Sequence, residues 1–387
     1  MRFKFSNRIQ DLPPYLFADI DRKKRELKAA GVEIIDLTVG DPDRPTPGFI
    51  IKEMKKWLDN PLTHRYPSYE GTIEFRGAVA QWYKNRFGVD IDPETEVVTL
   101  IGSKEGIAHL PLAVINPGDI ALVPDPAYPV YNIGVHFAGG KAFIMPLLRE
   151  NNFLPDFELI QKDLAMNAKL LFLNYPNNPT SATSSPEFFE TATKYAMDRK
   201  LILCHDAAYS EVFTSKASKP SSILQVEGAK ECAIEFHSLS KTFNMTGWRI
   251  GFAAGNAEVV QALKRVKTNV DSGVFTAIQM AGITALKGYS RVNKQQQSLF
   301  RERRKVMTDG LKKIGIDVFQ SYATFYIWAR TPDGETSKAF ANRLLEAGVA
   351  VTPGNGFGRY GEGYFRISLT TDTKNLKEAI YRIKKNL

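Results

Sequence analysis

Short apolar runs alternate with longer amphipathic stretches along the chain from residue 46 onward. The apolar runs have the length of buried strands, whereas the stretch at 72–87 repeats its apolar positions with the period of a helix. Strands are predicted in this way at 97–101, 119–124, 168–174, 201–206 and 233–236. Because alternating strands and helices are typical of a doubly wound sheet, the pattern predicts an α/β fold.

The C-terminal part of the chain predicts a second, smaller domain. A long helical stretch at 290–314 leads to strand-like runs at 325–329 and 364–369, with a helix between them at 337–347. Near the N-terminus, a helix at 18–30 stops at a glycine and a strand follows at 32–37. A chain of 387 residues is long enough for two domains with substantial cores.

Composition and charge add little to this picture. Hydrophobic residues make up 43% of the chain and charged residues 24%, as in ordinary globular proteins. The net charge of +9 raises the question of nucleic-acid binding. However, basic clusters such as 22–25 and 301–305 lie on amphipathic helical patterns that also contain acids, so they are interpreted as solvated faces. We therefore expect no nucleic-acid partner.

Cysteine content and the N-terminal residues bear on location. Cys204 and Cys232 are the only cysteines, and both have apolar neighbours, which is typical of reduced thiols in a cytoplasmic protein. The first 17 residues lack the continuous apolar core of a signal peptide. No apolar run is long enough to span a membrane, so we expect no membrane association.

The strongest candidate for chemistry is the segment 238–252, which follows the apolar run at 233–236. Lys241 has apolar residues on both sides, and a desolvated lysine has a lowered pKa and can form a Schiff base with an aldehyde. Ser238, Ser240 and Arg249 supply the hydroxyls and the fixed cation that hold a phosphate dianion. An aldehyde and a phosphate in one ligand describe pyridoxal 5'-phosphate. The alternative is a lysine that extends to solvent beside a buried turn.

Two turns at strand ends offer further contacts to a ligand. Ser103 and Lys104 open a predicted helix after the strand at 97–101, and free N–H groups at a helix start bind phosphate. Gly40 lies at the tip of the turn after the strand at 32–37, where it permits close approach of a ligand or serves as an ordinary turn glycine. The loop at 64–71 is unusually aromatic, which marks a partner surface, a ligand wall or packing.

Polar residues at other strand ends point to the same ligand, because ligands of open α/β sheets bind at the carboxyl ends of strands. Asn178 follows one such strand, and its amide can bond a ring hydroxyl and a carboxylate. Asp206 ends the next strand, where a pyridinium N–H is a fitting partner and a cap of the next helix is the alternative. Tyr209 can meet the ring oxygen, and Tyr128, in a proline-rich loop, can stack on a flat ring or pack in the core.

Arg366 lies inside the predicted strand at 364–369 among aromatic and aliphatic residues. A buried arginine needs an anionic partner, which is either a substrate carboxylate or a structural acid. Together with the groups above, it completes one contact for each feature of a complex between pyridoxal phosphate and an amino acid.

On these residues, the chain resembles the fold-type I, class I/II aminotransferases over nearly its whole length. The resemblance is carried by 39–42, 177–180, 206–209 and 238–241, with Arg249 and Arg366. It departs from the family at Ser181, where a glycine is usual after Asn-Pro-Thr, which puts the local turn geometry in doubt. The resemblance implies a large domain at 45–285, with a mostly parallel seven-stranded sheet between helices, and a smaller α+β domain built from 1–44 and 286–387.

The resemblance also implies a role for each residue. Lys241 would bond the cofactor and shuttle the proton, Asp206 would keep the ring nitrogen protonated, and Tyr128 would stack on the ring. The remaining cofactor contacts would be Asn178 and Tyr209 at the ring oxygen, and Ser103, Lys104, Ser238, Ser240 and Arg249 at the phosphate, with Tyr66 from the second subunit of a homodimer. Gly40, Asn178 and Arg366 would hold the substrate carboxylate, and no metal is implied.

Within the family, the segments 13–17, 64–67 and 103–106 look most like the subfamily that acts on LL-diaminopimelate in lysine biosynthesis. In that subfamily, Tyr15 and Lys104 would also hold substrate, and the amino group would pass to 2-oxoglutarate in a ping-pong reaction. The alternatives are a broad-range aspartate, alanine or aromatic aminotransferase, a C–S lyase, or a regulator on the same fold. Such regulators carry an added DNA-binding domain, and this chain reaches the first family motif by Gly40, which leaves no room for one.

Overall fold

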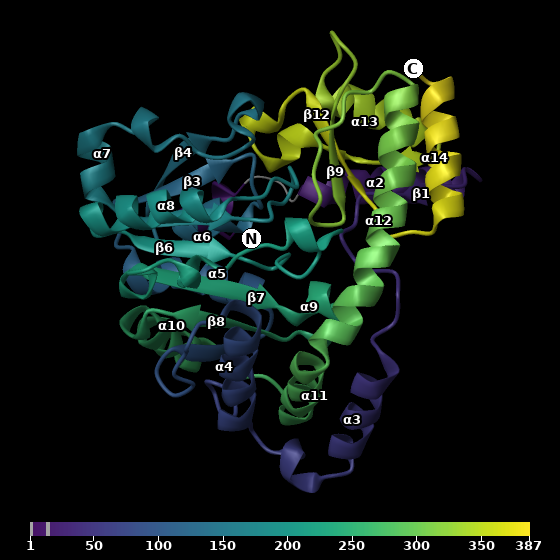
Figure 1. The fold of residues 1–387 in the computed structure, drawn as a ribbon. Coiled ribbons are helices and arrows are strands. Elements are labelled where there is room, and N and C mark those ends of the chain that lie inside the picture. The colour runs from purple at the N-terminus through teal and green to yellow at the C-terminus, as the bar shows by residue number, and fades with distance from the viewer. Residues whose placement is uncertain (1–2, 13–15) are drawn as a thin grey trace.

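The computed structural model of the protein describes residues 3–12 and 16–387, and its centre is a seven-stranded sheet (Figure 1). The strand order is β2-β8-β7-β6-β5-β3-β4. Strands β3 to β7 run parallel to one another where they pair, whereas β8 is antiparallel to both of its neighbours. The bounds are β2 (Val97–Leu100), β3 (Ile120–Asp125), β4 (Lys141–Pro146), β5 (Ala168–Asn174), β6 (Ile202–Asp206), β7 (Ala233–Ser238) and β8 (Gly251–Gly255). The predicted α/β class with a mostly parallel sheet is confirmed.

Helices cover both faces of this sheet, which is why its central strands are apolar throughout rather than alternating. One core joins α5 (Ser103–Val114), α6 (Val130–Phe137) and α10 (Ala257–Val270) to side chains such as Phe172 and Phe236. The other core joins α3, α4, α8 and α11 to the alternate side chains of the same strands, including Leu171 and Leu203. Those helices are α3 (Gly48–Leu58), α4 (Ile73–Phe87), α8 (Pro186–Arg199) and α11 (Thr276–Lys287).

Segments near the two ends of the chain meet in a second group of strands and helices beside the large sheet (Figure 1). The parallel pair β1–β10 joins residues from the two ends, because Ile35 pairs with Val349 and Asp36 with Ala350. A three-stranded antiparallel sheet has the order β11-β12-β9, and the helices pack with these strands around a separate core. The bounds are β1 (Ile35–Asp36), β9 (Tyr326–Arg330), β10 (Val349–Ala350), β11 (Thr352–Pro353), β12 (Tyr364–Ser368), α2 (Leu16–Ala29), α13 (Ser337–Glu346) and α14 (Thr373–Lys385).

Helix α12 (Tyr289–Lys313) is the long helix predicted at 290–314, and it runs from the large sheet to α14 (Figure 1). With 25 residues, it is about 37 Å long. The short elements of the chain are α1 (Asn7–Gln10), α7 (Lys162–Asn167) and α9 (Leu239–Thr242). None of the helices in residues 3–12 and 16–387 is long and apolar enough to cross a lipid bilayer.

Most predicted elements lie within a few residues of the observed ones, and two differ in an informative way. The strand expected at 32–37 is reduced to Ile35–Asp36, because only these two residues pair in register with β10. Strand β7 extends beyond the predicted 233–236 to Ser238 and carries Glu235 at its centre with no exposed surface. A run interpreted as apolar therefore contains a fully buried carboxyl group.

Candidate active site

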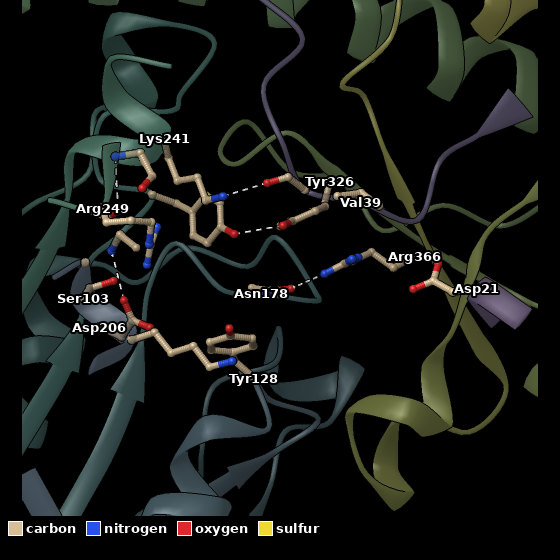
Figure 2. Close-up of a pocket in the computed structure, with 17 residues that line it drawn as sticks. Asp21, Val39, Ser103, Tyr128, Asn178, Asp206, Lys241, Arg249, Tyr326 and Arg366 are labelled. Atoms are coloured by element: carbon tan, nitrogen blue, oxygen red, sulfur yellow. Dashed lines mark hydrogen bonds between the residues drawn. The ribbon is translucent and has the colours of Figure 1, made fainter. Parts of the chain in front are cut away.

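A pocket of about 440 Å³ lies at the carboxyl ends of β5, β6 and β7, between the large sheet and the three-stranded sheet (Figure 2). Residues from four separate predicted motifs and from both ends of the chain line it. The predicted site residues among the lining ones are Gly40, Ser103, Lys104, Tyr128, Asn178, Asp206, Tyr209, Ser238, Ser240, Lys241, Arg249 and Arg366. The fold thus brings together twelve of the fourteen residues singled out from the sequence.

Lys241 projects into this pocket from the one-turn helix α9, directly after β7. Ser238 caps α9, because its hydroxyl accepts the backbone N–H of Ser240 at 3.2 Å. The Lys241 Nζ atom donates to the carbonyl oxygen of Gly40 at 2.7 Å (Figure 2). Burial lowers the pKa of Lys241 from its usual 10.5 to about 8, and the nearby Arg249 and Arg366 guanidinium groups also lower it. About a tenth of this lysine is therefore a neutral nucleophile at pH 7, far more than for an exposed lysine. A lowered pKa is what its apolar sequence context predicts.

The start of α5 and Arg249 form a cradle for an anion. Gly102 is the N-cap of α5 with φ of 83°, and a Cβ atom at this position would lie only 2.6 Å from Nη2 of Arg249. Nη2 is held in turn by the carbonyl oxygen of Ile101 at 3.3 Å. The hydroxyl of Ser240 is buried without a hydrogen-bond partner among the described residues. Free helix-start N–H groups, a guanidinium and an unpaired hydroxyl in one place are a donor set for a phosphate.

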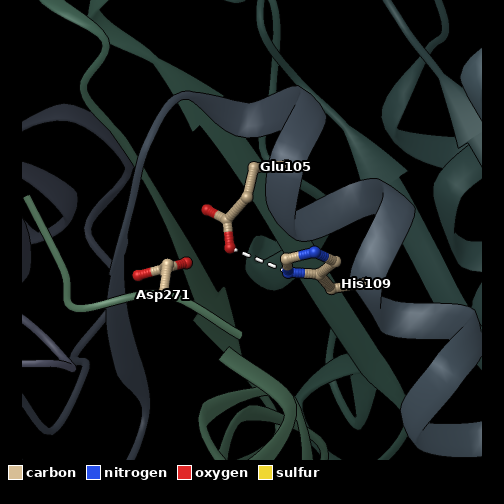
Figure 3. Close-up of side chains that lie close together, drawn as sticks. All are labelled: Glu105, His109 and Asp271. Carbon is tan, nitrogen blue, oxygen red and sulfur yellow. Dashed lines mark hydrogen bonds and ion pairs between the residues drawn. The ribbon is translucent and has the colours of Figure 1, made fainter. Parts of the chain in front are cut away.

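A cluster of charged side chains supports this cradle from behind (Figure 3). Glu105 accepts the backbone N–H of Ile101 at 3.0 Å and bonds Nδ1 of His109 at 3.0 Å. The carboxylate of Asp271 lies beside them, in a grouping whose ligand atoms are close enough for a metal ion. The Nζ atom of Lys267 already reaches both Asp271 oxygens, at 2.7 and 2.9 Å, so the cation held by this cluster is an ammonium group.

Asp206 ends β6 with its carboxylate at the floor of the pocket. Tyr131 on α6 donates its hydroxyl to Oδ2 at 2.8 Å, and the backbone N–H of Ala208 donates to Oδ1 at 3.1 Å. Burial raises the pKa of Asp206, and the Tyr131 hydrogen bond opposes that rise. The chain after Asp206 makes turns rather than a helix, so the alternative of a helix cap does not hold. A buried carboxylate with two donors still has acceptor capacity for a ring N–H.

Arg366 enters the pocket from β12 between two aromatic rings. Its guanidinium lies 4.1 Å from the ring centre of Tyr326 and 4.8 Å from that of Phe357. Nη1 donates to Oδ1 of Asn178 and Nη2 to the carbonyl oxygen of Thr38, both at 2.7 Å. Its Nε atom is buried without a partner, and within the described ranges Arg366 makes no ion pair with a carboxylate. The structural-acid alternative is therefore wrong for this part of the chain, and a carboxylate ligand remains the fitting anion.

Aromatic residues form the remaining walls. The Tyr209 hydroxyl lies 2.9 Å from that of Tyr326. The Tyr128 ring stands perpendicular to that of Tyr131, with 6.2 Å between ring centres, and Nζ of Lys104 lies 5.6 Å from the Tyr128 ring centre. Lys104 therefore adds a cation at the edge of the pocket on the same side as Tyr128.

One predicted residue is not brought into the pocket of its own chain, a second lies outside the described residues, and one doubtful turn is explained. Tyr66 lies in the loop before α4 with 85% of its surface exposed, outside the pocket of its own chain. Tyr15 lies outside the described residues. Ser181, where the family has glycine, has φ of 64°, so the serine adopts the left-handed conformation that a glycine would.

Sequence reasoning missed several residues that line or support the pocket: Asp21, Val39, Gly102, Tyr131 and Tyr326. Tyr131, in the first turn of α6, follows Tyr128 by three residues, and this spacing is the one signal that could have placed the two rings near each other. Tyr326 is buried, as are the next three residues of β9, so nothing in that pattern distinguishes it from a core tyrosine.

Comparison with known proteins agrees with this geometry. The profile of the family described as aminotransferase class I and II matches residues 32–383. An LL-diaminopimelate aminotransferase from Aquifex aeolicus is 59% identical over 383 residues, which cover 99% of both chains. A second, from Syntrophobacter fumaroxidans, is 54% identical and covers 100% of this chain and 99% of its own length.

Solved structures give the same answer for the fold. The substrate-bound BacF structure from Bacillus subtilis is 40% identical with a TM-score of 0.95, and it covers 100% of this chain and 98% of its own. A Thermus thermophilus aspartate aminotransferase is 30% identical with a TM-score of 0.94, and it covers 100% of both chains. The chain belongs to the class I and II aminotransferases. It is a pyridoxal phosphate-dependent enzyme of the transaminase type, and the donor set described above fits that cofactor.

Proposed function

We propose that this enzyme moves an amino group from LL-diaminopimelate to 2-oxoglutarate in a ping-pong reaction. The product would close to tetrahydrodipicolinate, a precursor of lysine. The observation that carries this choice is identity of 52–59% over nearly the whole chain to relatives named for that reaction. Structures named for aspartate or aromatic aminotransferases share the fold at only 30–32% identity.

The cofactor would be held at three points. Arg249, Ser238, Ser240 and the N–H groups at Ser103 and Lys104 would bind its phosphate. Asp206 would keep the ring nitrogen protonated, because an ionised carboxylate favours the positively charged ring. Asn178 and Tyr209 would bond the ring oxygen, and Tyr128 would stack on the ring. When bound, pyridoxal phosphate supplies an electron sink for the carbon that loses a proton.

Lys241 would bond the cofactor and, once released by the incoming amine, move the proton. Its pKa near 8 suits both roles, because a general base works best with a pKa close to the operating pH. Arg366, together with Asn178 and the backbone at Gly40, would hold the α-carboxylate of the substrate. This grip fixes the α-carbon beside the lysine, which supplies much of the rate by orientation.

The far end of the substrate would meet Lys104 and Tyr15. Lys104 supports this assignment, because its ammonium group lies at the edge of the pocket beside Tyr128 and is suited to a second carboxylate. A single-ended substrate such as alanine has no group for this contact. Lys104 therefore favours a donor that carries a second carboxylate.

We further propose a homodimer in which each pocket receives Tyr66 from the second subunit. An exposed apolar set surrounds that tyrosine: Leu58, Leu62, Tyr69 and Ile73. Such a patch on a folded surface marks an interface. Light scattering should give twice the chain mass of 43.4 kDa, and a monomer with full activity would contradict the proposal.

Residues 45–285 would form the large cofactor-binding domain, with 1–44 and 286–387 forming the small one. The separate core of β1, β9 to β12, α12 and α14 supports this division. We propose the cytoplasm as the location, because Cys204 and Cys232 are both free thiols.

The test is a donor panel with purified protein, added cofactor and 2-oxoglutarate. The panel contains LL-diaminopimelate, meso-diaminopimelate, N-succinyl-LL-diaminopimelate, aspartate, alanine and phenylalanine, and the readout is glutamate formed. We expect the highest kcat/KM for LL-diaminopimelate and no turnover by Lys241→Ala. If LL-diaminopimelate yields no glutamate while another donor does, the substrate assignment is wrong although the enzyme class stands.

A further inference from the structure

A fully buried polar cluster lies behind the pocket, on the opposite face of the large sheet. Successive side chains of a strand point to opposite faces, so Asp206 faces Tyr131 on α6, whereas His205 faces the core built by α4 and α8. Glu235 and His237 of the neighbouring strand β7 share that face. His205 and Glu235 have no exposed side-chain surface. None of these groups touches the pocket.

The contacts of Glu235 favour an ionised carboxylate, because a backbone N–H and two hydroxyls donate to it and two histidine nitrogens face it. Its Oε2 atom lies 2.8 Å from Nδ1 of His205 and 3.0 Å from the backbone N–H of Ile223. Its Oε1 atom receives the hydroxyls of Tyr83 and Ser222, at 2.9 and 2.8 Å, and faces Nε2 of His237 at 2.7 Å. A protonated carboxyl group would need an acceptor among these partners. The surrounding donors hold the pKa of Glu235 well below its usual range despite its burial.

His205 lies between two acceptors. Its Nδ1 atom faces the Glu235 carboxylate at 2.8 Å, and its Nε2 atom faces the backbone carbonyl oxygen of Tyr175 at 2.9 Å. A carbonyl oxygen cannot donate, and an ionised carboxylate cannot either. In a neutral imidazole, one ring nitrogen is an acceptor, so one of these two contacts would be repulsive. Both contacts are hydrogen bonds only if both ring nitrogens carry protons.

His237 is under no such constraint. Its Nε2 atom faces Glu235, but its Nδ1 atom lies 3.3 Å from the hydroxyl of Ser210, which can donate or accept. A neutral His237 with its proton on Nε2 satisfies both contacts. The two histidines therefore differ in their expected charge although they share one carboxylate.

We propose that His205 is a permanent imidazolium paired with Glu235, and that it acts as a positioning residue for the two strand ends that meet the cofactor ring. Its Nε2–H group holds the carbonyl oxygen of Tyr175, three residues before Asn178. It also precedes Asp206 directly, and the Asp206 carbonyl oxygen is held by the Asn174 side chain at 2.8 Å. A positive charge one residue from a buried carboxylate favours its ionised form. The proposal rests on the cofactor chemistry of the enzyme class and is independent of the substrate.

The other charged and titratable groups near the pair are few. Tyr83 comes from α4, and Phe189 of α8 covers His205 edge-on with 4.9 Å between ring centres. The buried ion pair of Arg86 with Glu211 lies at 2.8 Å and is electrically neutral as a unit. Burial raises the pKa of Asp206, whereas the hydrogen bonds of Tyr131 and Ala208 and the charge of His205 lower it. The balance at Asp206 therefore depends in part on the charge of His205.

The direct test is solid-state ¹⁵N NMR of the holoenzyme labelled only at its histidine rings. The chain has five histidines, so His205 is assigned by loss of its signals in His205→Asn. An imidazolium gives two protonated ring nitrogens, and a neutral imidazole gives one. We expect both ring nitrogens of His205 to remain protonated throughout a series from pH 6 to pH 9. A neutral His205 at pH 7 would overturn the proposal.

A variant test separates positioning from simple packing. In Glu235→Gln, the anion that balances the imidazolium is removed, so His205 should become neutral while the volume of the side chain is kept. Cofactor affinity should fall by about tenfold, since a charged hydrogen bond behind Asp206 is lost. The absorbance of the lysine-bound cofactor should also titrate at a different pH. His136→Asn, in the last turn of α6 and half-buried, is the control and should change neither quantity.

Unchanged cofactor affinity and titration in a folded Glu235→Gln variant with a neutral His205 would contradict the positioning role. If the variant does not fold, as judged by circular dichroism, the pH series on the natural chain still decides the charge of His205. The donor panel is unaffected by either result, so failure of this proposal is distinct from failure of the substrate assignment.

Discussion

Nη1 of Arg366 lies 2.7 Å from Oδ1 of Asn178, and this bond joins the three-stranded sheet to the loop after β5 of the large sheet. The two walls of the pocket are thus linked by a guanidinium that has donors left over, including an unpaired Nε–H. A substrate carboxylate that binds Arg366 would therefore contact both parts of the structure at once.

Arg366→Lys should lower kcat/KM for every amino donor by about ten- to hundredfold. Lysine keeps the charge, but it has no planar fork and cannot bond Asn178, Thr38 and a carboxylate together. Steady-state kinetics with two donors check this prediction. Arg330→Lys, on the exposed end of the neighbouring strand β9, is the control and should leave kcat/KM unchanged. Equal losses in both variants would indicate damage to the sheet rather than to the carboxylate grip.

Asp206→Asn should lower kcat by more than about a hundredfold, because an amide leaves the charged ring nitrogen without its anionic partner.

Tyr131→Phe removes only the hydroxyl that bonds Oδ2, and it should raise the pKa of Asp206 and cost about fivefold in cofactor affinity. Equilibrium dialysis of the cofactor and single-turnover rates measure the two effects. A Tyr131→Phe loss as large as that of Asp206→Asn would mean that the tyrosine does more than orient the carboxylate.

Lys241→Met should stabilise the cofactor-free protein below pH 8. The folded-state pKa of about 8 lies below the unfolded value of 10.5, so the unfolded chain binds the proton more tightly and burial of the charged amine destabilises the fold. This penalty, about 3 kcal/mol at most, is complete below pH 8 and disappears as the pH rises towards 10.5. After loss of the bond to Gly40, we expect a net gain of about 1–2 kcal/mol at pH 7. Urea unfolding at pH 7 and pH 10 checks the value and its decline.

Capture of the cofactor should accelerate with pH, since only the neutral amine of Lys241 attacks an aldehyde. The second-order rate for pyridoxal phosphate binding to cofactor-free protein should rise about tenfold per unit below pH 8 and level off above it. Stopped-flow absorbance gives this rate. A profile that is flat between pH 6 and pH 8 would show that the lysine is already neutral throughout.

Gly40→Ala should impair substrate binding through a defined collision. A Cβ atom at Gly40 would lie 1.8 Å from the Tyr326 hydroxyl oxygen, which is itself bonded to Tyr209. We expect KM for donors to rise at least about tenfold, because the segment that carries the Gly40 carbonyl must shift. In the double variant with Tyr326→Phe, the closest remaining atom is 2.8 Å away, so part of the loss should be recovered. If KM does not recover in the double variant, the collision with the Tyr326 hydroxyl is not the cause of the loss.

The sequence predicted many of the residues that meet in the pocket, because several motifs carry their polar group at a strand end. Asp206 ends β6, and Lys241 lies in the turn of helix that follows β7. The carboxyl ends of parallel strands meet at one edge of a sheet. Arg366 was recognisable as a buried cation that needs an anion. Twelve such residues line one pocket, although which of them contact the cofactor stays a prediction.

The parts that were not predictable depend on packing between distant segments. Tyr131 meets Asp206 only because α6, which packs on β3 and β4, places this side chain near the end of β6. Tyr326 meets Gly40 only because segments near the two ends of the chain come together. The apolar run that became β7 contains Glu235, whose buried charge is stabilised by donors from α4, β6 and the 222–223 turn. A local pattern cannot show that such donors will converge.

Ser181 gives the turn after β5 a property that a glycine would not. Its left-handed backbone stores strain of about 1 kcal/mol, which a glycine would relieve. In exchange, its hydroxyl bonds Oγ1 of Thr324 at 2.7 Å and the carbonyl oxygen of Tyr326 at 2.9 Å. The side chain thus links the loop that contains Asn178 to the strand that contains Tyr326 by hydrogen bonds. A chain with glycine here would have a more relaxed turn after β5, but it would lose both hydrogen bonds to the 324–326 segment. In this protein, the serine hydroxyl therefore helps to fix the loop after β5 against β9.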